Sequence, residues 1–430
     1  MEKSQKEIEF HPRTIEGIVL EASTGKPIPK ARVMAGGQVV LTGREGIFQL
    51  KDTSPDAAIT VKAPGYAPLG VVVGEESRLQ VRLRPFYVKG LYLTFFGTGD
   101  REIRGRVLDL LENTELNAVI IDVKGDRGWI AYKSTIPLAQ EIGATAVTTM
   151  RDPEGLLAYL KERGIYTIAR VVVFKDNVLA RSRPDLAVID SRTGRPWIDR
   201  EGLAWTDPFK EEVWEYNLAI AQEAARKGFD EIQFDYLRFP SDGHLRSITL
   251  SRPNTMEERL QAIGGFLARA QPKLLPMGVF IAADIFGYTN WRTDDTGIGQ
   301  RIEEVAQYVD FLSPMVYPSS YHAGIPGFRF SVAYPYEIVF LSLKRAVERL
   351  QDNPIKIRPW LQDFRDYGFD GRLYSAKEVL AQMKAAQDAG AWGWMLWNPR
   401  VRYTREALAP KPSPQAPSPR EARNKGARDY

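Results

Sequence analysis

The segment Asp230–Pro240 (DEIQFDYLRFP) places carboxylate and amide side chains inside an otherwise apolar run. Alternation of apolar and polar residues, stopped by a proline, predicts a buried strand. Asp235 stands near the carboxyl end of this strand, with Gln233 two residues earlier on the same face. A buried carboxylate is costly unless it is paired. Asp235 therefore predicts a catalytic site or, alternatively, a structural ion pair with an arginine such as Arg238.

Polar side chains also stand in or at the ends of six other apolar runs. In chain order they are Asp122 and Lys124; Arg170; Asp284; Tyr317; Trp360 and Gln362; and Trp397 and Asn398. Asp122 and Lys124 are two residues apart, which predicts that they share a face. Arg170 lies among Ala, Ile and Val, where a charge needs an acidic partner. Stability alone does not account for so many polar residues at strand ends, so we expect a functional site there.

The chemistry that these residue types support is narrow. Carboxylates framed by tryptophans and amides are typical of glycoside hydrolysis, in which one carboxyl acts as the acid and the other as nucleophile or base. Gln362 and Asn398 can hydrogen-bond sugar hydroxyls, while Trp360 and Trp397 can stack on sugar rings. No Gly-x-Ser-x-Gly segment supports acyl transfer, and no Gly-rich phosphate loop follows a strand candidate.

Eight apolar runs of strand length alternate with amphipathic helical stretches between residues 87 and 408. The strand candidates are 88–95, 118–124, 166–174, 231–239, 278–286, 311–317, 355–361 and 393–397. Eight repeats of strand then helix predict an α/β protein with a closed (β/α)₈ TIM barrel. Catalytic groups of such barrels lie at the carboxyl ends of the strands, where the polar residues stand.

Residues 14–86 differ, because short apolar runs are separated there by turn residues. This spacing predicts a small all-β sandwich. The segment resembles the carboxypeptidase regulatory-like (transthyretin-like) domain through residues 17–19, 24–33, 42–50 and 63–66. The resemblance implies a spacer or binding accessory. We expect residues 1–13 to be a flexible start and the Pro/Ser-rich residues 409–430 to be a disordered tail.

The barrel region resembles a family of glycoside-hydrolase-like barrels known as DUF4015. The matching segments are 88–94, 117–124, 169–171, 229–240, 284–287, 313–318 and 358–362. The resemblance implies that Asp235 is the nucleophile or base. For the partner acid, Asp284 is the first choice, Asp122 the second and Asp363 the third. The remaining predicted site residues bind substrate: Asp122, Lys124, Arg170, Gln233, Tyr317, Trp360, Gln362, Trp397 and Asn398.

Composition excludes several classes of function. The chain of 430 residues has a net charge of +4, which argues against nucleic acid as a partner. It has no cysteine, and its three histidines are far apart, so thiolate and histidine metal sites are disfavoured and no cofactor is expected. The polar start predicts no signal peptide, and no apolar stretch predicts a membrane span. Family and tail indicate an extracellular or cell-surface location, with the cytoplasm as the alternative.

Three alternatives stay open at this point. The first is a catalytically inactive barrel of the cell surface that binds glycans. The second is an aldolase- or isomerase-like barrel for phosphorylated metabolites, although Gly371-Arg372 is a poor phosphate site. The third concerns residues 293–297 (TDDTG), which could bind calcium but lack the ligand spacing of a known loop.

Overall fold

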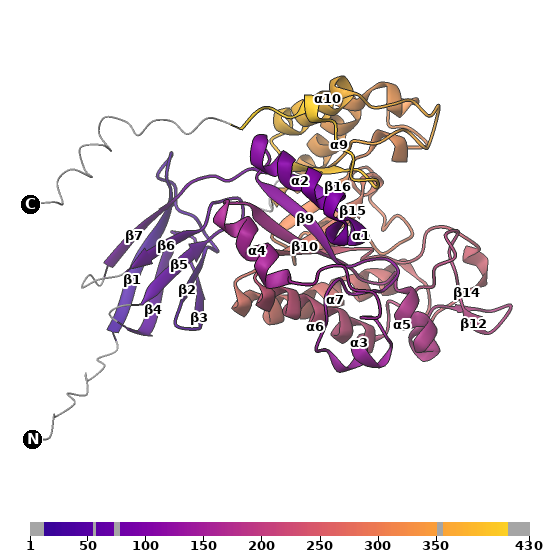
Figure 1. Cartoon of the computed structure of the whole chain (residues 1–430), viewed down its shortest axis with the longest axis horizontal. Helices are drawn as coiled ribbons and strands as arrows, with labels where there is room; N and C mark the ends of the chain where they lie inside the picture. Colours follow the sequence, from indigo (N-terminus) through magenta and orange to yellow (C-terminus); the bar gives the residue numbers. More distant parts are fainter. Residues whose placement is uncertain (1–12, 55–56, 73–77, 351–355, 412–430) are drawn as a thin grey trace, which may run out of the picture.

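A computed structural model of the chain describes residues 13–54, 57–72, 78–350 and 356–411. These residues form a small β-sandwich followed by a (β/α)₈ barrel (Figure 1). Residues 1–12 and 412–430, which hold most of the predicted flexible start and disordered tail, lie outside the described residues. Among the described residues, no helix has the length and apolar character needed to cross a bilayer.

The sandwich consists of a three-stranded sheet in the order β4-β1-β7 and a four-stranded sheet in the order β3-β2-β5-β6. Its strands are β1 Arg13–Glu21, β2 Arg32–Ala35, β3 Gln38–Leu41, β4 Ile47–Thr53, β5 Ala58–Lys62, β6 Leu69–Val72 and β7 Arg78–Leu83. Alternate residues such as Val19, Leu50 and Val61 are fully buried between the sheets. The β-rich region predicted here is confirmed, while its membership of the regulatory-like family stays a prediction.

The barrel closes through eight parallel strand positions, because the last strand pairs with the first. The strands are β8 Val88–Leu93, β9 Ala118–Lys124, β10 Tyr166–Val172, β13 Glu231–Asp235, β15 Phe280–Phe286, β16 Phe311–Met315, β17 Lys356–Ile357 with β18 Trp360–Gln362, and β19 Gly393–Trp397. The seventh position is split at Pro359, which has no N–H for the ladder. The predicted TIM barrel is confirmed.

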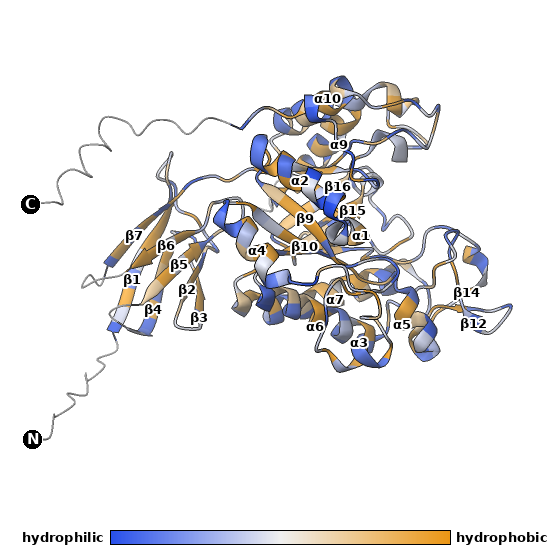
Figure 2. Cartoon of the chain, viewed as in Figure 1, coloured by the Kyte–Doolittle hydropathy of each residue, from blue (hydrophilic) through white to orange (hydrophobic). Residues whose placement is uncertain are grey.

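Helices pack around the outside of the strands (Figure 1). The longer ones are α2 Arg101–Asn113, α4 Pro153–Glu162, α6 Glu211–Lys227, α7 Met256–Leu274, α9 Pro335–Arg349 and α10 Ala376–Asp388. Short helices are α1 Phe95–Gly99, α3 Pro137–Glu141, α5 Asn177–Ser182 and α8 Ile302–Val305. Each longer helix turns an apolar stripe towards the strands, and Figure 2 shows α6 and α7 with alternating hydrophobic and hydrophilic colour.

Alternation along the strands separates two layers of core. On β9, Ile121 and Val123 belong to the large cluster between strands and helices, whereas Ala118 and Ile120 face the barrel interior. Strands buried on both faces read as continuous apolar runs. Asp122 continues the inward set, so its position inside the barrel follows from the same alternation.

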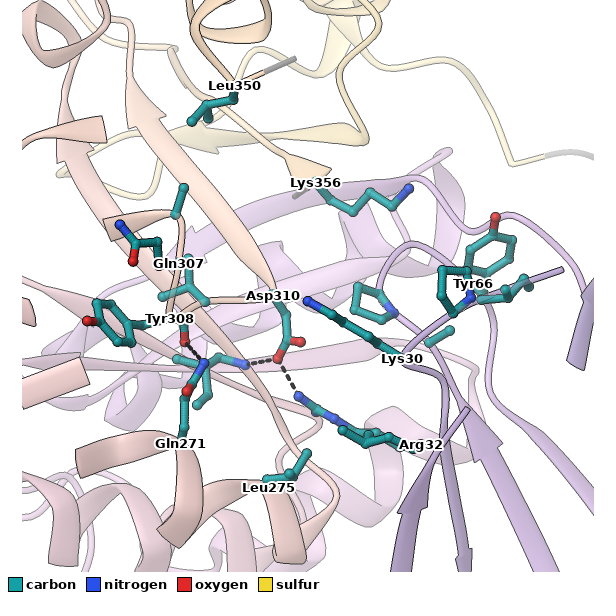
Figure 3. A pocket seen from close by; sticks show the side chains of 18 of the residues that line it. Lys30, Arg32, Tyr66, Gln271, Leu275, Gln307, Tyr308, Asp310, Leu350 and Lys356 are labelled. Carbon is teal, nitrogen blue, oxygen red and sulfur yellow. Dashed lines mark hydrogen bonds and ion pairs between the residues drawn. The ribbon is translucent and has the colours of Figure 1, made fainter. Parts of the chain in front are cut away.

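The sandwich contacts the floor of the barrel, by which we mean the amino-terminal ends of its strands. Arg32 on β2 donates to the carbonyl oxygen of Val279 at 2.5 Å and to Oδ2 of Asp310 at 2.6 Å. A cavity of about 990 Å³ lies beside this ion pair, with Lys30 and Lys356 among its lining residues (Figure 3). Its lining residues in the barrel precede or begin strands, so the cavity lies at the end of the barrel opposite the predicted site.

Candidate active site

The mouth of the barrel, formed by the carboxyl ends of its strands, holds a line of charged side chains from three neighbouring strands. Nη1 of Arg170 donates to Oδ1 of Asp122 at 2.6 Å. Its Nε and Nη2 donate to Oδ2 of Asp235 at 2.9 and 2.6 Å. All three side chains are buried. Asp235 therefore forms an ion pair with a buried arginine, which was the alternative to a catalytic role. Its partner is Arg170 and not Arg238, the arginine named in that alternative.

Asp122 is held by two further donors. Its Oδ2 accepts the hydroxyl of Tyr92 at 2.5 Å and the backbone N–H of Phe95 at 3.1 Å. The ring of Tyr92 stacks on Trp397, with centroids 3.9 Å apart and planes 8° from parallel. Burial raises the pKa of Asp122, and the charge of Arg170 opposes this rise. Both oxygens of Asp122 are therefore occupied by protein donors.

Asp235 ends β13 at a strained turn. Its Oδ1 accepts the backbone N–H of Tyr236 at 2.6 Å. Tyr236 has a φ of 48°, which is unfavourable for a bulky side chain. Such strain concentrates at functional sites, where the surrounding structure imposes it. The turn fixes the direction in which Asp235 presents its carboxylate.

Asp284 on β15 has a different environment. Nε1 of Trp360 donates to its Oδ1 at 2.8 Å, while Oδ2 is buried without a hydrogen-bond partner among the described residues. The side chain is almost completely buried. Burial and then the charge of Asp235 raise the pKa of Asp284 well above its usual range. The raised pKa favours the protonated form of Asp284.

The mouth thus combines a carboxylate in an ion pair with a second carboxyl group whose raised pKa favours the neutral form and whose Oδ2 has no partner among the described residues. Two carboxyl groups whose environments separate their protonation states are the arrangement that acid–base catalysis at a glycosidic bond needs. Part of the chain is now also recognisable by comparison. A family model, DUF4015, described as "Putative glycosyl hydrolase domain", matches residues 90–403.

The chain belongs to the DUF4015 family. The resemblance inferred from the strand-end motifs is thereby confirmed, and the family description supports hydrolysis of glycosidic bonds as the general activity. No curated protein matches the chain in sequence.

Solved structures similar to this DUF4015 chain include glycoside hydrolases. The glycoside hydrolase domain of PgaB (BpsB) from Bordetella bronchiseptica is 15% identical, with a TM-score of 0.54 over 76% of this chain and 100% of that one. A chitobiase from Flavobacterium johnsoniae is 12% identical, with a TM-score of 0.50 over 89% and 56%. A hypothetical protein from Ruminiclostridium thermocellum ATCC 27405 is 39% identical over 45% of this chain and 96% of its own, with a TM-score of 0.40. The first two show the fold alone.

Within the DUF4015 barrel, Lys124 lies apart from the carboxylates of the mouth. The register between β9 and β10 shifts after Asp122, so that Lys124 no longer shares its face as expected. Its Nζ instead contacts Oδ2 of Asp176 at 2.8 Å, Oδ1 of Asn217 at 2.9 Å and the carbonyl oxygen of Val172 at 2.7 Å. All three donors of the ammonium have partners, and the side chain supports the wall of the barrel.

Gln362 and Asn398 are likewise occupied by the protein. Gln362 accepts the backbone N–H of Ser319 at 3.0 Å and donates to its hydroxyl at 2.7 Å. Asn398 donates to the carbonyl oxygens of Asp363 and Arg402. These amides hold the loops after the strands, so the structure does not present them to a sugar. Asp363 itself accepts two hydrogen bonds from Thr404, which leaves it a structural group.

Gln233, Tyr317 and Trp360 have their side chains in the barrel interior, and their role in substrate binding stays a prediction. Nε2 of Gln233 donates to Ser313 at 3.1 Å inside the barrel, and its Oε1 is buried without a partner among the described residues. Burial, and then the charges of Asp284 and Asp235, raise the pKa of Tyr317. Trp360 is the donor to Asp284 described above.

Three mouth residues escaped the prediction. Tyr92 stands on β8 two residues after Gly90, at an inward position that alternation could have identified. Tyr236 follows β13 directly and Asp126 is the second residue after β9, at positions where loop residues of barrels carry function. Asp126 is half-buried and its charge acts on Tyr92. Across the described part of the chain, no group of His, Asp and Glu could hold a metal ion.

Proposed function

We propose that the protein hydrolyses a polysaccharide at the mouth of its barrel, with Asp284 as general acid and Asp235 as nucleophile or base. The observation that carries the proposal is the environment of Asp284. Its carboxyl group is buried beside Asp235, its pKa is raised, and its Oδ2 is unpartnered among the described residues. A protonated carboxyl with a free oxygen is suited to donate a proton to a glycosidic oxygen.

Arg170 and Tyr236 position the second carboxyl group. Arg170 occupies Oδ2 of Asp235 with two hydrogen bonds. From the described residues Oδ1 accepts the N–H of Tyr236 alone, which leaves a second lone pair for water or for the anomeric carbon. Tyr317 and the stacked pair of Tyr92 and Trp397 offer aromatic surfaces for sugar rings beside these groups.

A glycan-binding barrel without activity is the second candidate. It is favoured by the ion pair of Asp235, since a carboxylate bound to a buried guanidinium is a weaker nucleophile than a free one. Binding alone, however, would not explain the neighbouring carboxyl group with the raised pKa.

The test is product release from a panel of bacterial polysaccharides by wild type, Asp235→Asn and Asp284→Asn. We expect either substitution to lower the rate by about 10²–10⁴-fold, because each removes a proton-transfer or nucleophilic group. The wild-type rate should fall as pH rises through the pKa of Asp284, since the acid must be protonated. The control is Asp294→Asn. Asp294 lies in the loop after β15, the strand that carries Asp284, and pairs with Arg292, so we expect this variant to keep the wild-type activity. Glycan binding without cleavage by any variant would leave only the binding barrel.

A further inference from the structure

Four arginine side chains of the described residues are buried, and one of them lacks a carboxylate partner. The three paired ones are Arg32 with Asp310, Arg170 with Asp122 and Asp235, and Arg358 with Glu231. The fourth is Arg238, which is 7% exposed and forms no ion pair with any described residue. A buried charge without a counter-ion is unfavourable, so the exception calls for an explanation.

The surroundings of Arg238 are aromatic. Its guanidinium carbon lies 4.6 Å from the ring centroid of Phe286 and 4.9 Å from those of Trp205 and Tyr236. Among the described residues, Nη1 alone makes hydrogen bonds, to the carbonyl oxygen of Phe239 at 3.0 Å and to the hydroxyl of Ser241 at 3.1 Å. Cation–π contacts offset part of the lost hydration, but Nε and Nη2 have no acceptor in the described part of the chain.

The carboxylates whose charges act on Arg238 have other partners. Asp235 is bound by Arg170. Asp199 accepts Lys175 at 3.0 Å and Nε1 of Trp205 at 3.0 Å. Asp242 accepts a backbone N–H at 3.3 Å. Three carboxylates therefore lie near enough for their charges to act on Arg238, but none of them forms an ion pair with its guanidinium.

The position of Arg238 links it to the mouth. It follows Asp235 by three residues, and the ring beneath it, Phe286, follows Asp284 by two. Tyr236, the second ring, is the residue whose N–H holds Asp235. Arg238 therefore follows the strand of Asp235 along the chain and contacts the strand of Asp284 through Phe286.

We propose that Arg238 determines specificity by binding an anionic substituent of the saccharide, a carboxylate or a sulfate ester. This inference rests on the proposed function, because it assigns the substrate class of the same site. A guanidinium with two free donors on adjacent nitrogens matches the two oxygens of such a group. The bound anion would be the counter-ion that Arg238 lacks among the described residues. A saccharide without an anionic substituent would leave the charge of Arg238 unpaired.

The test measures binding by the full chain carrying Asp284→Asn, which prevents turnover. Two matched pairs of probes are used: polygalacturonate with its carboxyl-reduced form, and dextran sulfate with dextran. We expect binding to the anionic member of one pair to be about 30-fold tighter than to its neutral counterpart. The pair that shows the preference distinguishes a carboxylate from a sulfate ester.

Arg238→Gln should abolish this preference, and Arg238→Lys should restore part of it. Arg246→Gln removes an exposed charge from the same loop and should leave the preference intact. Equal binding or no binding to the two members of both pairs overturns the inference, as does a preference that survives Arg238→Gln. The comparison of probes needs no change at Arg238, so the absence of a preference overturns the inference even if those variants do not fold.

The same experiments separate this inference from the proposed function. A preference for anionic probes that Arg238→Gln abolishes, without hydrolysis of any polysaccharide by wild type, would retain the role of Arg238 and contradict the enzyme. Cleavage of a neutral polysaccharide without such a preference would retain the enzyme and contradict the role of Arg238.

Discussion

The two ends of the barrel interior are built from the same kinds of residue. At the floor, Arg358 pairs with Glu231, which also accepts the hydroxyl of Tyr166 at 2.9 Å. At the mouth, Arg170 pairs with two aspartates, of which Asp122 also accepts a tyrosine hydroxyl. Each end therefore has an arginine, an acidic partner and a tyrosine, and composition alone does not distinguish them.

The difference lies in what surrounds each group. Arg358 and Glu231 are inaccessible to solvent, and the guanidinium packs on Phe311 at 4.3 Å. The sandwich contacts this end through Arg32. The mouth instead borders partly exposed aromatic rings, among them Trp397, and includes a carboxyl oxygen of Asp284 without a described partner. In our proposal the same side-chain chemistry serves stability at the floor and catalysis at the mouth, the end at which barrels of this kind carry their active sites.

The largest effect should come from breaking the floor. Arg358→Met leaves Glu231 buried with only the hydroxyl of Tyr166, and we expect a loss of about 3–5 kcal/mol in the free energy of unfolding. Urea denaturation followed by tryptophan fluorescence measures this loss. Arg269→Met, which breaks a surface pair with Glu211, is the control and should cost at most about 1 kcal/mol. Equal midpoints for the two variants would contradict a structural role for the floor.

The corresponding arginine-to-methionine substitution at the mouth, Arg170→Met, should lower the free energy of unfolding by less than Arg358→Met does. After Arg170→Met, Asp122 keeps the hydroxyl of Tyr92 and the N–H of Phe95, and Asp235 keeps the N–H of Tyr236. We expect a loss of about 1–3 kcal/mol, because three donors remain for the two carboxylates at the mouth, whereas Glu231 keeps a single one at the floor. Hydrolysis should be lost while the fold persists, as circular dichroism can show. A stability loss larger than that of Arg358→Met would remove the distinction between the two ends.

The sequence predicted the architecture well, because two of its patterns are local. One is the alternation of side chains between the two faces of a strand, and the other is the alternation of strand-like with helix-like segments. The eight strands and the inward positions of Asp122, Gln233 and Trp360 followed from them. The prediction at Lys124 depended on unbroken alternation, and a register shift of a single residue removed it. Such a shift depends on the neighbouring strand, so the residues of β9 alone do not reveal it.

The hydrogen-bond and ion-pair partners of the buried polar side chains could not be predicted from the sequence either. Gln362 and Asn398 have the residue types of sugar ligands, yet Gln362 bonds Ser319, 43 residues away, and Asn398 bonds Asp363, 35 residues away. Asp235 pairs with Arg170, 65 residues away, and not with the nearby Arg238. Residue type predicts that a buried polar group needs a partner, whereas only the closed barrel decides which partner it receives.

The most direct test of the account is the protonation state of Asp284. Infrared difference spectra between wild type and Asp284→Asn report the C=O stretch of a protonated carboxyl group at this position. We predict that the band is present at mildly acidic pH, where ordinary carboxyl groups are ionised, and disappears only as pH rises further, since burial and the charge of Asp235 raise the pKa of Asp284. A band already absent at that pH would show an ionised Asp284 and contradict its role as the acid.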